Sequence, residues 1–146
     1  MTDISSNAAA YAAYFERVSP DNLEELRDLC APDVRFRDPF NDVRGHDQII
    51  RIFAKMYEEV AEPKFEVVDN AVSGSNSYIR WVFRFKNKKN GRAFTVDGMT
   101  EVHFDEAGRV IAHLDHWDVA SQLYEHVPVL GAVLRLIRRR LALKPA

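Results

Sequence analysis

Hydrophobic positions in the first part of the chain recur at the three- and four-residue spacing of a helix. Tyr11, Tyr14 and Phe15 share one helical face within residues 8–18. This spacing predicts a first amphipathic helix, which ends at Ser19-Pro20.

Two further helices are predicted before the pattern changes. Asp21 and Glu24 have the spacing of a capping box, and residues 23–29 carry leucines at every third position, which indicates a short second helix that Pro32 ends. Residues 49–60 again place apolar side chains at helical spacing, which predicts a third helix.

From Lys64 onward, apolar and polar positions alternate, which is typical of strands. Residues 65–72 and 77–86 form two candidate strands, and the turn-forming residues 87–91 predict a hairpin after them. One face of the second strand is aromatic and is made by Trp81, Phe83 and Phe85.

Two more strands complete the alternating region. In residues 94–104 the even-numbered side chains, Thr100 among them, share one face, and residues 109–118 form the last strand. The last strand has Val110, Ala112, Leu114 and His116 on one side and Ile111, His113, Asp115 and Trp117 on the other.

Three helices followed by a meander of long antiparallel strands predict an α+β domain, with the helices on one side of a curved sheet. We assign residues 1–128 to this domain. Residues 129–146 are predicted to form a basic amphipathic helix that packs on the domain or on a partner subunit. A membrane-surface helix is the alternative for this segment.

Composition and charge limit the partners and the compartment that the sequence favours. The chain has 146 residues, 22 acidic and 20 basic side chains and a formal charge of −2, so nothing global indicates a nucleic-acid partner. Cys30 is the single cysteine, and we expect a buried thiol rather than a nucleophile. The first residues lack a basic leader and an apolar secretory segment, which favours a soluble, cytoplasmic protein.

The last strand carries the clearest chemical signal. Since both of its faces are expected to be covered, His113 and Asp115 are polar groups in an otherwise apolar layer. Such groups are costly unless they are paired, hydrated or used, which favours a lined cavity. The alternative is a hydrogen-bonded pair that fixes the core or a dimer interface. A metal site with His116 is not favoured, because alternation sends His116 to the opposite face.

Two further residues are weaker candidates when taken alone. Asp38 precedes Pro39, which keeps its backbone extended and projects its carboxylate from the end of a strand, although Asp-Pro is also a common turn. Tyr14 lies on the inner stripe of the first helix, where an aromatic residue is usually part of the core.

Several segments together resemble the superfamily of ketosteroid isomerase, SnoaL-like and nuclear transport factor 2-like proteins. The resemblance extends over residues 8–120. It rests on the order of elements and on the Tyr14 stripe, Asp21-Asn22-Leu23, Asp38-Pro39 and the turn at residues 107–110. It implies a cone-shaped antiparallel sheet wrapped around the N-terminal helices, a cystatin-like α+β barrel, and a homodimer formed through the outer face of the sheet.

The resemblance also implies roles for individual residues. Tyr14 falls at the oxyanion-binding tyrosine of the isomerases, and Asp38 falls at their catalytic base. Thr100 stands where the isomerases carry a protonated aspartic acid. Asp115 falls where SnoaL-type cyclases and limonene epoxide hydrolase-like proteins have an acid/base aspartate.

The sequence therefore predicts a pocket for a small apolar compound, with Tyr14, Asp38, His113 and Asp115 as catalytic residues. Its expected walls are Thr100, Trp81, Phe83, Phe85, Trp117 and Phe53. Burial against these walls would raise the pKa of the base toward neutrality. The expected activity is that of a cofactor-free isomerase, cyclase, hydratase or hydrolase acting on a polyketide-, terpenoid- or steroid-like compound. The alternative is a non-catalytic module that binds a hydrophobic ligand or scaffolds a partner.

Overall fold

Three helical segments form where the helical spacing predicts them. The computed structural model describes residues 3–145. Helix α1 (Ile4–Arg17) begins at Asp3, whose carboxylate accepts a hydrogen bond from the amide of Ser5. The turn η1 (Pro20–Glu25), α2 (Leu26–Leu29) and α3 (His46–Glu59) follow. The capping box is made by Ser19 and Asn22, not by the predicted Asp21 and Glu24.

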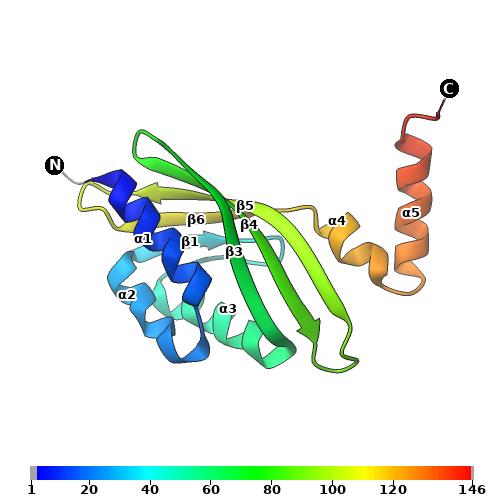
Figure 1. Ribbon diagram of the computed structural model, residues 1–146, viewed down its shortest axis with the longest axis horizontal. Helices are drawn as coiled ribbons and strands as arrows, with labels where there is room; N and C mark the ends of the chain where they lie inside the picture. Colours follow the sequence, from blue (N-terminus) through cyan, green and yellow to red (C-terminus); the bar gives the residue numbers. More distant parts are fainter. Residues whose placement is uncertain (1–2, 146) are drawn as a thin grey trace.

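Six strands form one curved sheet around these helices (Figure 1). Their bounds are β1 (Cys30–Arg37), β2 (Asp42–Arg44), β3 (Val60–Ser73), β4 (Asn76–Asn87), β5 (Ala93–Phe104) and β6 (Val110–His116). The strand order is β2-β1-β6-β5-β4-β3, so the sheet has two edges and stays open. The predicted α+β fold with helices on one face of a curved sheet is confirmed.

One strand pairing departs from the expected antiparallel meander. Strand β1 pairs with β6 in parallel, with Phe36 opposite His113 and Arg37 opposite Leu114. The sheet is therefore mixed, because β1 precedes the meander in sequence and joins it at the far edge of β6. Its first residue, Cys30, is buried in a strand rather than in the predicted helix.

A bulge changes the faces of β6 near its start. His103 pairs with Ala112, whereas Phe104 pairs with Val110, so Ile111 is the extra residue. Val110 is consequently buried and Ile111 is exposed, so Ile111 does not share the inward face of His113 as the alternation predicts. Beyond the bulge, His113 and Asp115 keep the predicted inward face.

The chain continues beyond the sheet into short helical segments. These are α4 (Val119–Gln122), η2 (Tyr124–His126) and α5 (Leu130–Leu141). The side chain of Gln122 accepts from the amide of Asp97 and donates to its carbonyl, which joins α4 to the part of β5 that extends past β6. Helix α5 stands away from the sheet at the C-terminal end (Figure 1).

Candidate active site

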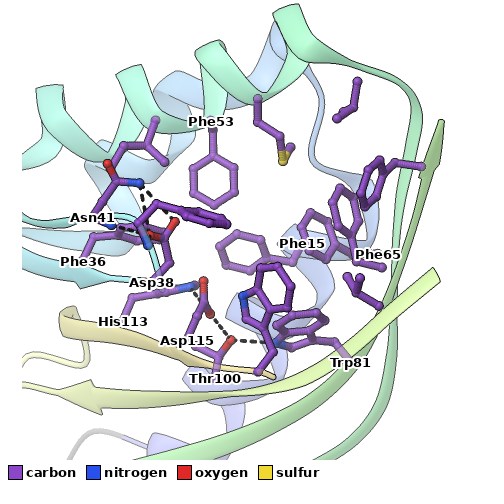
Figure 2. A pocket seen from close by; sticks show the side chains of 18 of the residues that line it. Phe15, Phe36, Asp38, Asn41, Phe53, Phe65, Trp81, Thr100, His113 and Asp115 are labelled. Carbon is purple, nitrogen blue, oxygen red and sulfur yellow. Dashed lines mark hydrogen bonds and ion pairs between the residues drawn. The ribbon is translucent and has the colours of Figure 1, made fainter. Parts of the chain in front are cut away.

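A cavity of about 670 Å³ lies between the concave face of the sheet and the helices. Phe36 and Asp38 line it from the β1 end, and Phe53 of α3 lies across the cavity from Trp81 and Thr100 (Figure 2). All the predicted site residues except Tyr14 line it: Asp38, Phe53, Trp81, Phe83, Phe85, Thr100, His113, Asp115 and Trp117. The fold thus gathers these residues from β4, β5, β6, α3 and the segments that follow β1 and β6 around one cavity.

Aromatic side chains make most of one wall. Phe65 stacks on Phe83 with ring centroids 4.1 Å apart, and Phe83 stacks on Phe85 at 5.0 Å. Trp81 meets Phe65 edge to face. Stacked rings present a flat apolar surface, which suits a flat apolar ligand.

The parallel pairing of β1 and β6 brings the two candidate carboxylates to one side. Phe36 is opposite His113, and their rings are stacked with centroids 5.0 Å apart. Side chains two residues further along adjacent strands face the same way, so Asp38 and Asp115 both point into the cavity. Figure 2 shows the two carboxylates on the same wall.

Hydrogen bonds converge on one oxygen of Asp115. The Thr100 hydroxyl donates to Oδ1 of Asp115 at 2.5 Å, and Nε2 of His113 lies 3.0 Å from the same oxygen. The indole N–H of Trp81 donates to the oxygen of Thr100 at 2.8 Å. Because an indole N–H can only donate, this bond directs the Thr100 proton toward Asp115.

A second hydrogen bond, at Nδ1, holds the ring of His113 in place. The hydroxyl of Tyr11 lies 2.8 Å from Nδ1 of His113, and both residues are buried. With Nε2–H donating to Asp115, Nδ1 of a neutral imidazole accepts the proton of Tyr11. The hydrogen bonds then run from Tyr11 through His113, and from Trp81 through Thr100, to Oδ1 of Asp115. Within residues 3–145, Oδ2 of Asp115 has no protein donor and is free to meet a ligand.

Tyr11 is the residue of this network that sequence reasoning missed. Burial raises the pKa of its hydroxyl well above the ordinary value, so Tyr11 stays a protonated donor. It lies on the same helical stripe as Tyr14, one turn earlier. The pattern within the helix contains no signal that separates the two, because the choice depends on where His113 lies across the sheet.

Tyr14 is placed differently from the expectation. Its hydroxyl donates to the backbone carbonyl of Asn22 at 3.2 Å, and its side chain does not line the cavity. The pKa of Tyr14 is also raised, mainly by burial. The hydrogen bond to Asn22 gives Tyr14 a structural place between α1 and η1, with no oxyanion contact in the cavity.

Asp38 both lines the cavity and closes a turn. Its Oδ1 accepts from the amides of Phe40 at 2.8 Å and Asn41 at 2.7 Å, and from the Asn41 side chain at 3.1 Å. Three donors on one oxygen make this carboxylate the centre of the loop that follows β1. Asp115 accepts from two donors, both on Oδ1, and its other oxygen faces the cavity without a protein donor within residues 3–145. It is therefore the better placed of the two for proton transfer.

A metal centre has no support from the geometry of residues 3–145, where no group of three His, Cys, Asp or Glu side chains could hold an ion. His116 faces away from the cavity, and its Nε2 lies 3.3 Å from Glu101 on the outer face. No helix in the same range is long and apolar enough to cross a membrane.

Comparison with known proteins identifies the family of this chain. Residues 11–113 match a family described as the SnoaL-like domain. No curated protein matches the sequence significantly.

Three similar solved structures share the fold of this chain. An NTF2-like protein of unknown function from Burkholderia pseudomallei has a TM-score of 0.71 and 23% identity, covering 83% of this chain and 95% of that one. A putative SnoaL-like polyketide cyclase from Jannaschia has a TM-score of 0.71 and 18% identity, covering 83% and 92%. An epoxide hydrolase of the LEH-like type from M. tuberculosis has a TM-score of 0.67 and 12% identity, covering 92% and 97%.

Proposed function

Because the chain belongs to the SnoaL-like domain family, we propose that it is a cofactor-free acid/base enzyme acting on a small apolar compound. The observation that carries the proposal is the convergence of two hydrogen-bond chains on Oδ1 of Asp115 at the wall of an apolar cavity. A carboxylate held in this way has a fixed direction, which general base catalysis requires.

The chemistry follows from the free oxygen of Asp115. Its Oδ2 takes a proton from a carbon next to a carbonyl group, or from a water molecule that then attacks the ligand. Negative charge develops on a ligand oxygen during the first of these steps. Trp117 lines the same cavity and its indole N–H has no protein partner within residues 3–145, so it can donate to that oxygen.

The proposed substrate is a flat, largely apolar ring compound of polyketide, terpenoid or steroid type. The stacked wall of Phe65, Phe83 and Phe85 supports this class. The similar proteins that are called a polyketide cyclase and an epoxide hydrolase support proton transfer or water activation as the reaction type.

Asp115→Asn tests the proposal. The amide oxygen can still accept from Thr100 and His113, while the basic oxygen is lost. We expect turnover to fall by about 10²- to 10⁴-fold. Substrates to assay are a β,γ-unsaturated ketosteroid, limonene oxide and an aromatic polyketide ester. Binding of anilinonaphthalene sulfonate should stay within about threefold of wild type, because the variant keeps the shape of the cavity.

Two tryptophans make the binding measurement specific to the cavity. The chain contains only Trp81 and Trp117, and both line the cavity, so their fluorescence reports a bound ligand. Asp33→Asn, which changes an exposed carboxylate on β1, is the matched control and should keep full turnover. Wild-type protein that binds the dye but converts none of the substrates would instead be a ligand-binding module. Full turnover by Asp115→Asn would exclude Asp115 as the base.

A further inference from the structure

Helix α5 is attached to the rest of the protein by polar contacts. Arg138 donates two hydrogen bonds to the carboxylate of Glu125, at 2.7 and 3.1 Å, and Arg135 donates to the backbone carbonyl of Glu125. Gly131 lies so close to the backbone of Glu125 that a larger side chain would collide with it. Glu125 itself is buried. These contacts fix which side of α5 faces the domain.

The apolar stripe of α5 is consequently left in solvent. Leu130, Val133, Ile137 and Leu141 recur at helical spacing and are 46%, 50%, 50% and 83% exposed. Val129 and Leu143 extend the exposed apolar surface at the two ends of the helix. Single exposed apolar residues are common on protein surfaces, but a contiguous stripe of this length indicates an interaction surface.

The charges around the stripe are all positive. Residues 126–146 contain no acidic side chain and carry five basic ones: Arg135, Arg138, Arg139, Arg140 and Lys144. Glu125 is the carboxylate that pairs with Arg138. Arg139, Arg140 and Lys144 have no ion pair within residues 3–145. A surface that complements both the stripe and these charges must be apolar and anionic together.

A second α5 does not meet that requirement, because residues 126–146 contain no acidic side chain that could neutralise Arg139, Arg140 and Lys144. The interface of an anionic bilayer does meet it, since apolar side chains enter the acyl region while arginines reach the headgroups. We propose that α5 is a membrane-surface helix that binds anionic phospholipid through its apolar stripe and its arginines.

This inference is independent of the proposed function, because no residue of α5 lines the cavity. The chain segment that connects the cavity to α5 is short, however. Leu123 lines the cavity and Glu125 anchors α5, so binding at the bilayer would hold the cavity next to the membrane. Because α5 does not line the cavity, a variant that loses membrane binding should keep its turnover in the absence of vesicles.

Vesicle flotation with the full chain tests the proposal. The vesicles are phosphatidylcholine alone and a mixture of phosphatidylcholine with phosphatidylglycerol. Wild-type protein should bind the anionic vesicles and not the neutral ones, and salt should weaken this binding. The double variant Val133→Ser/Ile137→Ser should bind at least tenfold more weakly. The variant Arg139→Gln/Arg140→Gln should also lose tenfold or more, because each basic residue near an anionic surface strengthens binding about fivefold.

Val68→Ser is the matched control, because Val68 on β3 is 55% exposed and lies outside α5. It should bind like wild type. Circular dichroism checks that the α5 variants remain folded, which is expected because the substituted side chains face solvent. Equal vesicle binding by wild type and the Val133/Ile137 variant would overturn the proposal. So would a dimer, seen by sedimentation equilibrium, that this variant abolishes, since the stripe would then be a subunit interface.

Discussion

At the scale of single residues, the network around His113 depends on one tyrosine. Tyr11 is the donor to Nδ1 of His113 in a fully buried position. Tyr11→Phe would leave that nitrogen buried without a partner, which costs about 1–3 kcal/mol of unfolding free energy. Urea denaturation at neutral pH measures this loss.

Tyr14→Phe is the natural control, because Tyr14 is equally buried on the same helix but bonds to the carbonyl of Asn22. A carbonyl has a second lone pair and its site is only partly buried, so we expect a loss of about 0.5–1.5 kcal/mol. Nitrogen NMR shifts of His113 add a readout that stability alone does not give. They should show the Nε2–H tautomer in all three proteins, because Nε2–H still donates to Asp115, and a shifted Nδ1 resonance only in Tyr11→Phe, where that nitrogen loses its donor. An unchanged Nδ1 resonance of His113 in Tyr11→Phe would exclude this role for Tyr11.

The sequence identified His113 and Asp115 because a polar pair on an apolar strand is conspicuous without any knowledge of neighbours. It did not separate Tyr11 from Tyr14, because both lie on one helical stripe and differ only in what the sheet places opposite them. The same limit applies to Asp38. Its position before Pro39 allows either a projecting carboxylate or a strand-ending turn, and only the folded loop shows that one carboxylate does both, because it accepts from the amides of Phe40 and Asn41.

At the scale of elements, the packing of β4 on β5 depends on Gly98. Gly98 is paired with Trp81 across the two strands. A Cβ atom at Gly98 would lie 2.7 Å from the ring of Trp81 and 2.8 Å from Cβ of Trp117. These distances are too short for unbonded carbon atoms, so a side chain here must displace an indole ring.

Gly98→Ala should therefore move Trp81 away from Thr100 and lower the unfolding free energy by about 1–3 kcal/mol. The tryptophan emission of the folded protein should shift, because the indole N–H of Trp81 loses its partner. Thr95→Ala, on the exposed face of the same strand, should change neither the emission nor the unfolding free energy by a comparable amount. Unaltered emission from Gly98→Ala would mean that the strands adjust without moving the ring.

The alternation along β4 and β5 was sufficient to predict their cavity faces. In a regular antiparallel pair, successive side chains point to opposite faces, so an apolar face determines which residues point inward. Two features of the neighbouring strands were beyond this reasoning. The bulge at Ile111 comes from the pairing of β6 with β5, and the parallel direction of β1 comes from the path of the chain. Periodicity along one strand contains neither piece of information.

At the scale of the whole molecule, the amphipathic pattern of α5 was visible in the sequence but its orientation was not. The sequence pattern favours packing of the stripe on the domain or on a partner subunit, because an apolar helix face is ordinarily buried. In the structure the domain contacts the other side of the helix, because the buried Glu125 binds Arg138. One carboxylate therefore decides which face of α5 remains available.

The response of the whole protein to alkaline pH follows from three buried acids on α1 and β1. Burial raises the pKa of Cys30 to about 12 and raises the pKa values of Tyr11 and Tyr14 above their ordinary range. In the unfolded chain these groups ionise near their ordinary values, about 8.5 for cysteine and about 10 for tyrosine. Above those values the unfolded chain binds fewer protons than the folded protein. The stabilising contribution is therefore complete below about pH 8 and is lost as the pH rises toward the folded pKa values.

We expect the unfolding free energy, measured by urea denaturation between pH 7 and pH 11, to be level at first and to fall steeply above about pH 9. Tyr11→Phe/Cys30→Ser removes two of the three groups, so its curve should start lower and fall less steeply than that of wild type. The difference in slope is the decisive quantity, because a loss of packing alone shifts the whole curve without changing its shape. Parallel curves for the two proteins would show that Tyr11 and Cys30 ionise in the folded state as readily as in the unfolded chain, and would contradict the prediction.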